Sequence, residues 1–405
     1  MFIMRILIVS QYFWPETFRI NDLAIELKNK GYDVEVLTGK PNYPKGDFFS
    51  GYGFLKRPKD IYNGIKIHRV PIIPRKKGSG LRLIFNYFSY VLFASAHVLF
   101  KRKKYDATLI FAISPITQAY PALLHKKLSG SKAYLWLQDL WPESVSSSGK
   151  IRSKFIINAL EEMVKSIYLK TDKILVQSEA FIPLIEEKIG KSKSIEYIPN
   201  WAEDFFSNTV SDIPARISKL MPSGFNIVFA GNIGESQDFD SIVKAAVETR
   251  QYKNINWVII GDGRRRHWLE EMITKLELKE TVHLLGRFPV EDMPYFFSLA
   301  DIMLVSLKSD YIFSLTIPSK LQSYMAASKP ILSLMDGIGN QIIERAECGY
   351  TANAEDYTNL ALNAIKASQT SKEKLILMGE KGRKYYLQEF DKNRVINKIT
   401  QILSS

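Results

Sequence analysis

The chain of 405 residues contains a single cysteine, Cys348, and only five histidines. One cysteine excludes an internal disulfide, and the lack of a cysteine cluster argues against structural zinc. The histidines do not stand in the spacing of a helical zinc motif, so we expect no metal site and no metal cofactor. Together with 46% hydrophobic and 24% charged residues, these absences are typical of a globular protein in a reducing cytosol.

Glycine-rich nucleotide motifs are also missing from the first half of the chain. The turn from Ser10 to Arg19 contains no glycine, which disfavours NAD binding after the first expected strand. Gly190-Lys191-Ser192 resembles the end of a P-loop, but it continues a helical pattern and follows no strand. Asp238 and Asp240 imitate a metal-binding DxD pair, yet carboxylates at a helix start are ordinary caps.

Acidic residues are scarce between positions 51 and 132, where 16 lysines and arginines face two acids, whereas the whole chain carries +13. Inside this window, Ile84–Phe100 is aromatic-rich and uncharged, and Lys101–Lys104 follows it directly. The run is slightly shorter than the roughly 18 residues of a spanning helix. It predicts a helix lying on an anionic membrane, and hence a peripheral protein on the cytoplasmic face of the cytoplasmic membrane. A buried helix with solvated lysines at its ends is the alternative; no nucleic-acid motif appears.

Strand-like and helix-like periods alternate along most of the chain. This pattern predicts an α/β protein with two Rossmann-like lobes facing across a cleft. Composition changes near Pro199–Pro222 and places the expected boundary there. We expect a first domain over residues 1–200, a second over 201–380, and a helical segment over 381–405.

Two segments of the second domain have features of an anion site. Gly231, Asn232 and Gly234 lie in a turn between an expected strand and a helix, where backbone N–H groups can meet phosphate. Pro318 and Ser319 mark the start of another helix, and Lys320 follows in its first turn. A lysine there opposes the helix dipole, which makes sense if an anion binds beside it. The alternative is a solvated lysine.

Three segments of the first domain have features of a carbohydrate site. Gln138, Asp139 and Glu143 follow a strand among two tryptophans, and carboxylates and amides suit sugar hydroxyls. The alternative is a helix cap beside core tryptophans. Residues 12–22 and 40–46 each follow an expected strand at the same edge of the sheet.

These segments together resemble the retaining glycosyltransferases of family 4, which have the GT-B fold. The resemblance covers nearly the whole chain and lies in YFWPETFRINDLAIELKNKGYDVEVLTGKPNYPKG, QDLWPES, AGNIG, GDG and IPSKLQSYMAASKPIL, in this order. Among these enzymes, the sequence is similar to the N-acetyl-L-fucosaminyl transferases of O-antigen and capsule biosynthesis.

The resemblance implies an acceptor-binding, membrane-facing first domain, a nucleotide-sugar-binding second domain, and a C-terminal helix, Lys381–Leu403, that crosses back. It implies metal-independent transfer from a UDP-sugar to a polyprenyl-diphosphate-linked saccharide. The catalytic candidates are Gln138, Asp139 and Lys320. The nucleotide-sugar candidates are Gly231, Asn232, Gly234, Arg264, Ser314, Pro318, Ser319, Lys320 and Gln322. The acceptor candidates are Glu16, Arg19, Asn42, Tyr43 and Glu143.

The sequence departs from the family pattern at several positions. Thr17-Phe18-Arg19 stands where a Gly-Gly is usual, Gln138 replaces a histidine, and a lysine is lost near Gln237. Ser314 and Gln322 occupy the positions of a glutamate pair. These losses leave two alternatives open, a sugar-nucleotide epimerase of the same shape and a non-catalytic scaffold on the membrane.

Overall fold

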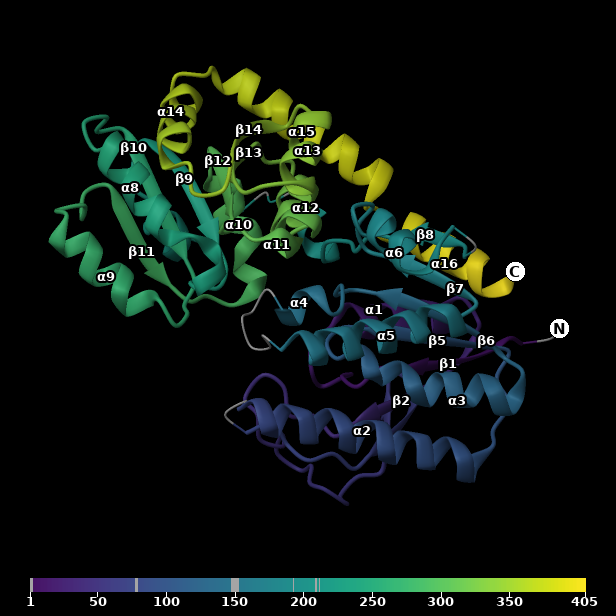
Figure 1. Cartoon of the computed structure of the whole chain (residues 1–405). Coiled ribbons are helices and arrows are strands. Elements are labelled where there is room, and N and C mark those ends of the chain that lie inside the picture. Colours follow the sequence, from purple (N-terminus) through teal and green to yellow (C-terminus); the bar gives the residue numbers. More distant parts are fainter. Residues whose placement is uncertain (1–2, 77–78, 147–152, 192, 208–209, 211) are drawn as a thin grey trace. The chain divides into compact units, whose positions relative to one another are not determined.

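The computed structural model describes residues 3–76, 79–146, 153–191, 193–207, 210 and 212–405. It divides into two compact units, one of residues 1–199 with 396–405 and the other of residues 200–395. Each unit is a twisted sheet with helices packed against it (Figure 1).

The first unit contains an eight-stranded sheet in the order β3-β4-β2-β1-β5-β6-β7-β8. Its strands are β1 (Arg5–Val9), β2 (Asp33–Gly39), β3 (Lys59–Tyr62), β4 (Ile65–Val70), β5 (Ala107–Ala112), β6 (Lys132–Leu137), β7 (Lys173–Val176) and β8 (Ile195–Tyr197). All pairings are parallel except that of β3 with β4. Every residue of β5 is buried, as expected for a central strand with helices on both faces.

The helices of the first unit connect these parallel strands. They are α1 (Arg19–Asn29), α2 (Gly80–Lys101), η1 (Ile116–Gln118), α3 (Ala119–Ser129), α4 (Glu143–Ser146), α5 (Lys154–Lys170) and α6 (Phe181–Ile189). The strand order reverses between β1 and β5, so the crevice at their carboxyl ends is the expected ligand position in this sheet.

The second unit contains a six-stranded parallel sheet in the order β11-β10-β9-β12-β13-β14. Its strands are β9 (Phe225–Ala230), β10 (Ile255–Ile260), β11 (Val282–Gly286), β12 (Ile302–Ser306), β13 (Ile331–Leu334) and β14 (Gly349–Ala352). Its helices are η2 (Asp204–Ser207), α7 (Ala215–Ser218), η3 (Glu235–Gln237), α8 (Phe239–Thr249), α9 (Arg266–Lys275), η4 (Val290–Asp292), α10 (Met293–Leu299), α11 (Tyr311–Leu315), α12 (Ser319–Ala326), α13 (Ile338–Arg345), α14 (Tyr357–Ser368) and α15 (Lys372–Glu389). Here the strand order reverses between β9 and β12.

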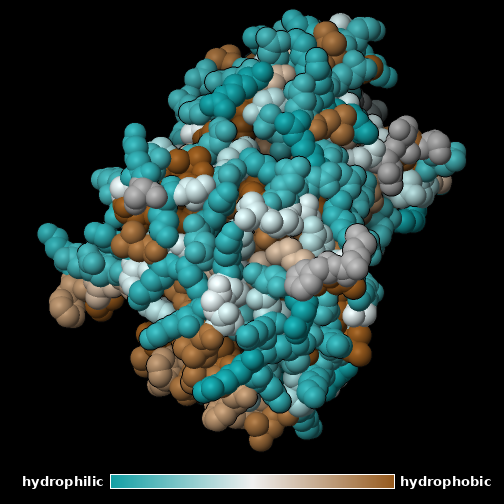
Figure 2. Space-filling view, turned by 90° about the vertical axis from the view of Figure 1, so that its right-hand side faces the viewer, coloured by the Kyte–Doolittle hydropathy of each residue, from teal (hydrophilic) through white to brown (hydrophobic). Residues whose placement is uncertain are grey.

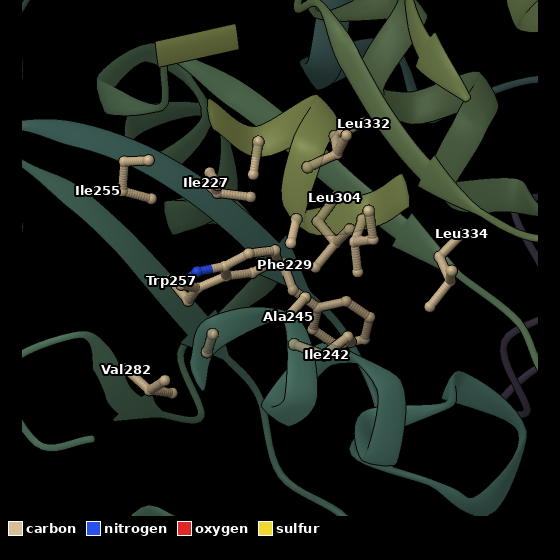
Figure 3. Close-up of a cluster of buried hydrophobic side chains, with 14 of the residues drawn as sticks. Ile227, Phe229, Ile242, Ala245, Ile255, Trp257, Val282, Leu304, Leu332 and Leu334 are labelled. Carbon is tan, nitrogen blue, oxygen red and sulfur yellow. The ribbon is translucent and has the colours of Figure 1, made fainter. Parts of the chain in front are cut away.

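The core of the second unit lies between one face of its sheet and the helices α8, α9 and α14. Ile227, Phe229 and Trp257 of the central strands meet Ile242 and Ala245 of α8 in this core (Figure 3). A tightly packed core of this kind fixes the strand ends, and therefore also the loops that follow β9 and β12.

The C-terminal region differs from the single crossing helix expected over Lys381–Leu403. It forms two helices, α15 and α16 (Lys392–Ser404), and only residues from Ile396 onward belong to the first unit. The guanidinium of Arg383 in α15 donates to the carbonyl oxygens of Ala326 (2.8 Å) and Ser207 (3.0 Å), which holds α15 to the second unit. In the first unit, Lys30 Nζ donates to Asn397 Oδ1 of α16 (2.7 Å).

Candidate functional site

A cavity of about 490 Å³ opens at the carboxyl ends of the strands of the second unit. Its lining comes from the segments that follow β9, β10 and β11 and from α10 and α12: Glu203, Phe206, Ala230, Gly231, Asn232, Ile260, Gly261, Asp262, Arg287, Phe288, Val290, Met293, Phe297, Ser319, Lys320, Ser323 and Tyr324. The volume and the position are those of a small-molecule site in a parallel α/β sheet.

Lys320 is the central cation of this cavity. Its ammonium has no hydrogen bond or ion pair with any residue that the structure describes, and Nζ lies 4.9 Å from the centre of the Phe229 ring. Burial lowers the pKa of this amine from 10.5 to about 8. Because Lys320 lies in the first turn of α12, its charge adds to the positive end of the helix dipole. An unpaired, partly dehydrated ammonium at this place favours an anionic ligand.

Two glycines, Gly231 and Gly261, line the cavity with backbone atoms only. A Cβ on Gly261 would collide with the carbonyl oxygen of Gly231, so the loops after β9 and β10 approach each other only because neither carries a side chain there. The φ of both residues is +147°, which glycine adopts without strain. The N–H groups of both glycines are hydrogen-bonded, that of Gly231 to the carbonyl oxygen of Ile260 (2.9 Å) and that of Gly261 to the carbonyl oxygen of Gly286 (2.8 Å). The glycines therefore leave room for a ligand rather than free donors.

Aromatic side chains form one wall of the cavity. Phe206 stacks on Phe297, with ring centres 5.1 Å apart, and Phe297 meets Tyr324 edge-on at 5.3 Å. Phe288 lies after β11, next to Arg287. A flat heterocycle suits an aromatic wall of this kind. None of these aromatic residues was among the predicted site residues. Gly286, which ends β11, indicates that the residues after it lie at the carboxyl edge of the sheet, where ligands bind.

The predicted nucleotide-sugar residues fall into two groups. Gly231, Asn232, Ser319 and Lys320 line the cavity, as the sequence predicts. The others are not among its lining residues: Gly234, Arg264, Ser314, Pro318 and Gln322. Gln322 is 1% exposed and donates through Nε2 to the carbonyl oxygen of Asn200 (2.6 Å). Ser314 Oγ donates to the carbonyl of Tyr311 (2.8 Å), while Arg264 is exposed.

Gln138 and Asp139 follow β6 at the carboxyl edge of the first sheet. Asp139 Oδ2 accepts the backbone N–H of Ser114 (2.8 Å) in the loop after β5. One carboxylate oxygen therefore fixes two neighbouring loops, and the side chain remains partly exposed. Gln138 is largely buried behind it. Asp139 thus keeps a position suited to a sugar hydroxyl, whereas little of Gln138 is exposed to a ligand.

Three predicted acceptor residues, Glu16, Asn42 and Glu143, are buried or paired within the first unit. Glu16 is 3% exposed, and its Oε1 accepts the N–H groups of Asn42 (2.8 Å) and Tyr43 (2.7 Å). Burial raises the pKa of the Glu16 carboxyl to about 7 although these hydrogen bonds oppose the shift. Asn42 is fully buried, and Glu143 forms an ion pair with Lys188 (2.7 Å). Glu16 and Asn42 lie in loops outside the helices and strands, so no hydrophobic period indicates their burial.

Tyr43 and Arg19 remain candidates for the acceptor. Tyr43 is exposed and packs with Tyr12 and Phe18, with ring centres 5.7 and 5.5 Å away. Arg19 begins α1 and is partly buried. The edge of the first sheet thus presents aromatic rings next to cations, an arrangement that suits sugar rings and anions.

The aspartates of the DxD-like pair both have partners in the second unit. Asp238 caps α8 by accepting the N–H of Ser241, and Asp240 forms an ion pair with Arg265. Among the residues that the structure describes, no group of three histidine, cysteine or acidic side chains could hold a metal ion.

Within the described parts of the chain, α2 is the one helix long and apolar enough to cross a membrane by length and composition. Only 28% of its most apolar window is buried. Hydrophobic surface gathers at the lower end of the space-filling view (Figure 2), and Figure 1 places α2 at the lower end of the first unit.

Comparisons with known proteins agree with this geometry. Residues 216–385, which include most of the cavity, match the family model described as Glycosyl transferases group 1. The chain is 24% identical over 338 residues to the putative colanic acid biosynthesis glycosyl transferase WcaI of Escherichia coli K12, covering 80% of this chain and 81% of that protein. It is 27% identical over 242 residues to the probable glycosyltransferase WbjE of Pseudomonas aeruginosa, covering 57% of this chain and 58% of that protein.

Solved structures share the whole fold at low sequence identity. Sucrose-phosphate synthase from Thermosynechococcus elongatus superposes with a TM-score of 0.73 at 15% identity, over 98% of both chains. Anabaena Alr3699/HepE, solved in complex with UDP and glucose, gives a TM-score of 0.69 at 15% identity, over 99% of this chain and 100% of that chain. The second unit thus matches the group 1 glycosyl transferases over residues 216–385, and the two parallel α/β units have the GT-B fold.

Proposed function

We propose that the chain transfers a sugar from a UDP-sugar to a lipid-linked saccharide, with retention of configuration, in the biosynthesis of a surface polysaccharide. The observation that carries this proposal is Lys320, an unpaired ammonium in a cavity of the second unit. A nucleoside diphosphate fits the surroundings of Lys320. Its diphosphate meets the ammonium, the Ser319 hydroxyl and the N–H groups of α12, and its base meets the aromatic wall.

The relatives and structural neighbours support the donor and the pathway class. Alr3699/HepE was solved with UDP and glucose, and an E. coli structure was solved with UDP-2-fluoro glucose. WcaI is described as a colanic acid enzyme, and another relative, TuaH of Bacillus subtilis, as a teichuronic acid enzyme. N-acetyl-L-fucosamine is the donor sugar we propose, from the resemblance of the sequence to transferases of that sugar.

The proposed reaction requires no strong base. The bond between the anomeric carbon and the diphosphate oxygen breaks, and a bond from that carbon to the acceptor hydroxyl oxygen forms on the same face. The hydroxyl proton passes to the departing diphosphate oxygen, so atoms and charge balance. Lys320 stabilises the negative charge of the leaving group.

The orientation of α2 supports a membrane location. Its apolar side chains point outward: Leu81, Ile84, Phe85, Phe88, Leu92, Leu99 and Phe100 are all exposed. Its polar side chains point inward, because Asn86 and Ser89 are buried and hydrogen-bonded to the backbone of Ile73. This orientation is the reverse of a helix on a water-exposed surface.

The occupant of this face is an anionic bilayer. Lys101, Arg102 and Lys104 are exposed at the end of α2, and Arg82 is exposed near its start. Cations at both ends of an apolar helix face suit a helix that lies in the lipid interface. We therefore place the protein on the cytoplasmic face of the membrane, where lipid-linked acceptors are available.

A thermal-shift screen tests the donor site. Wild type, Lys320→Met and Lys279→Met are heated with UDP, GDP, ADP and dTDP, with and without EDTA. Lys279 is exposed and controls for the loss of one positive charge. At 100 times its Kd, a ligand adds about 2.7 kcal/mol to stability, so UDP should raise the Tm of wild type and Lys279→Met.

Lys320→Met should lose most of the shift caused by UDP. An equal shift in Lys320→Met would place the diphosphate elsewhere. No shift with any nucleotide would contradict the proposal and favour a non-catalytic scaffold. A shift that disappears with EDTA would contradict metal independence.

A further inference from the structure

Arg75 lies in the segment between β4 and α2, at the edge of the first sheet where β1 and β2 end. Its guanidinium carbon is 5.0 Å from the centre of the Tyr43 ring and 5.8 Å from that of Tyr12. One guanidinium nitrogen, Nη1, donates to the Tyr12 hydroxyl (3.3 Å). The backbone N–H of Arg75 donates to Asn42 Oδ1 (3.3 Å), and the same oxygen accepts from Asn86 of α2. The position of Arg75 is therefore fixed at both the backbone and the side chain.

The charge of Arg75 is not neutralised in this position. No carboxylate among the described residues forms an ion pair with it, and the groups around its guanidinium are phenols. Burial raises the pKa of both Tyr12 and Tyr87, so these phenols stay neutral at physiological pH. Tyrosine rings hold a guanidinium by its face and leave most of its N–H groups free for a ligand.

Arg75 is also close to the expected reaction centre and to the membrane face. The charge of Arg75 lowers the pKa of Tyr87 in α2, and the charge of Asp139 raises it. Both side chains therefore lie near the same phenol. The exposed apolar face of α2 begins only six residues after Arg75, at Leu81. An acceptor that extends from Asp139 past Arg75 to α2 would have its sugar at Asp139, its charged linkage at Arg75 and its lipid on α2.

We propose that Arg75, surrounded by Tyr12, Tyr43 and Tyr87, binds the phosphate that joins the acceptor saccharide to its lipid. This inference rests on the proposed function and names the group that selects the acceptor. A planar guanidinium with free N–H groups matches phosphate oxygens in pairs, which favours phosphate over a neutral glycerol linkage. The tyrosine rings contribute a face for the adjoining sugar.

Calorimetric titration with farnesyl diphosphate tests this inference, and farnesol serves as the same chain without phosphate. UDP is present at saturation, so that the cavity around Lys320 is filled. The variants are Arg75→Met, Arg75→Lys, Tyr43→Leu and Lys45→Met. Lys45 is exposed on the loop that carries Tyr43, so Lys45→Met removes one charge nearby without touching Arg75.

We expect farnesyl diphosphate to bind at least about tenfold more tightly than farnesol. Arg75→Met should weaken the binding of farnesyl diphosphate by about 10- to 100-fold, the range for loss of a charge-assisted hydrogen bond. Arg75→Lys should retain part of the affinity, and Tyr43→Leu, at an exposed position, should also weaken binding. Lys45→Met should stay within about twofold of wild type.

Three outcomes would overturn the inference. They are equal affinities for farnesyl diphosphate and farnesol, an unchanged affinity in Arg75→Met, and the same loss in Lys45→Met as in Arg75→Met. Binding to phosphatidylglycerol vesicles distinguishes the two possible sources of the phosphate, a lipid headgroup and the lipid-linked acceptor. If Arg75→Met lost vesicle binding but kept its affinity for farnesyl diphosphate, Arg75 would bind lipid headgroups rather than the acceptor.

The same titrations without UDP, in the Lys320→Met background, keep this test separate from that of the proposed function. If wild type failed to bind UDP while these titrations still showed the Arg75-dependent affinity, the donor proposal alone would be contradicted.

Discussion

The side chain of Lys320 lies across Gly231, so that a Cβ on Gly231 would stand 2.6 Å from Cε of Lys320. Carbon atoms do not approach so closely, so the far end of the lysine side chain would have to shift. The present position of the ammonium therefore uses space that a side chain at residue 231 would take. Helix α12, which carries Lys320, and the loop after β9 therefore pack against each other at Gly231.

The first prediction follows from this contact. Gly231→Ala should weaken UDP binding by about tenfold or more, because Lys320 is displaced and the φ of +147° strains any other residue. Calorimetric titration measures the affinity, and the Tm reports the strain. Gly130→Ala is the matched control, since φ there is +73° and nothing lies within 4 Å of its Cβ position. It should lower stability but leave UDP binding unchanged, and a similar loss of affinity in both variants would contradict the role of the contact.

The second prediction concerns the cost of keeping Lys320 in the cavity. Its pKa falls from 10.5 in the unfolded chain to about 8 in the folded one. Below pH 8 the folded protein bears the full cost of a dehydrated charge, and between pH 8 and 10.5 stability rises as the unfolded state holds the extra proton. Lys320→Met removes this cost, so it should be more stable than wild type at pH 7 by about 1–3 kcal/mol.

Urea unfolding of wild type and Lys320→Met at pH 7 and at about pH 9.5 checks this prediction. The difference in unfolding free energy should shrink at the higher pH, because wild-type Lys320 is then mostly neutral. A variant that is less stable than wild type at pH 7 would show that Lys320 supports the fold rather than the ligand.

Sequence patterns were sufficient for most of the parallel sheet. The continuous apolar run Ala107–Ala112 is typical of a central parallel strand, which has apolar residues on both faces, and it forms β5. The hairpin of β3 and β4 was missed, although Asn63-Gly64 between them is a strong two-residue turn signal. Its strands are short and one lies at the edge of the sheet, so their hydrophobic pattern is weak.

The site was harder to predict than the fold. Lys320 was found because a lysine in the first turn of a helix conflicts with the helix dipole, which is a local property. Gln322 was assigned to the donor site because it occupies the position of the second family glutamate. It lies two residues after Lys320, a step that turns a helix by about 200° and buries this side chain. Arg75 has no motif and lies outside any helix or strand, so only the folded chain brings it to Tyr12 and Tyr43.

The third prediction concerns Glu16, whose carboxyl pKa burial raises from 4.5 to about 7. The folded state binds this proton more tightly than the unfolded chain, so its contribution to stability decreases as the pH rises from 4.5 to 7. Glu16→Gln keeps an oxygen for the N–H groups of Asn42 and Tyr43 without the charge. It should be more stable than wild type at pH 8 by about 1–3 kcal/mol and nearly equal to it at pH 4.5. Denaturant unfolding at both pH values measures this, and a destabilised Glu16→Gln at pH 8 would show that the charge itself is needed.

The fourth prediction tests the membrane face. Replacing Lys101, Arg102 and Lys104 by glutamine should weaken binding to phosphatidylglycerol vesicles by about 100-fold at low salt, since each cation near the surface contributes about 1 kcal/mol. Lys103 is left in place because it forms an ion pair with the buried Glu35. Vesicle sedimentation measures binding, and the difference should narrow in high salt.

Replacing the exposed Lys253, Lys275 and Lys279 of the second unit by glutamine is the matched control. This control should bind vesicles as wild type does. Equal losses in both triple variants would indicate a general effect of net charge and would contradict a membrane face at α2.

The last prediction separates charge from position at Asp139. Asp139→Asn can still accept the N–H of Ser114 but lacks the negative charge, so it should keep UDP affinity and lower kcat by about 100-fold, the scale of losing one electrostatic group at the reaction centre. Asp172 is the control, because its Oδ2 likewise accepts a backbone N–H, that of Ala133 (2.7 Å), in the turn before β7 rather than at the carboxyl edge of the sheet. Asp172→Asn should affect stability and leave kcat unchanged. Because the two aspartates have the same structural role at opposite edges of one sheet, a comparable loss of kcat in both variants would mean that Asp139 acts only by fixing its loop.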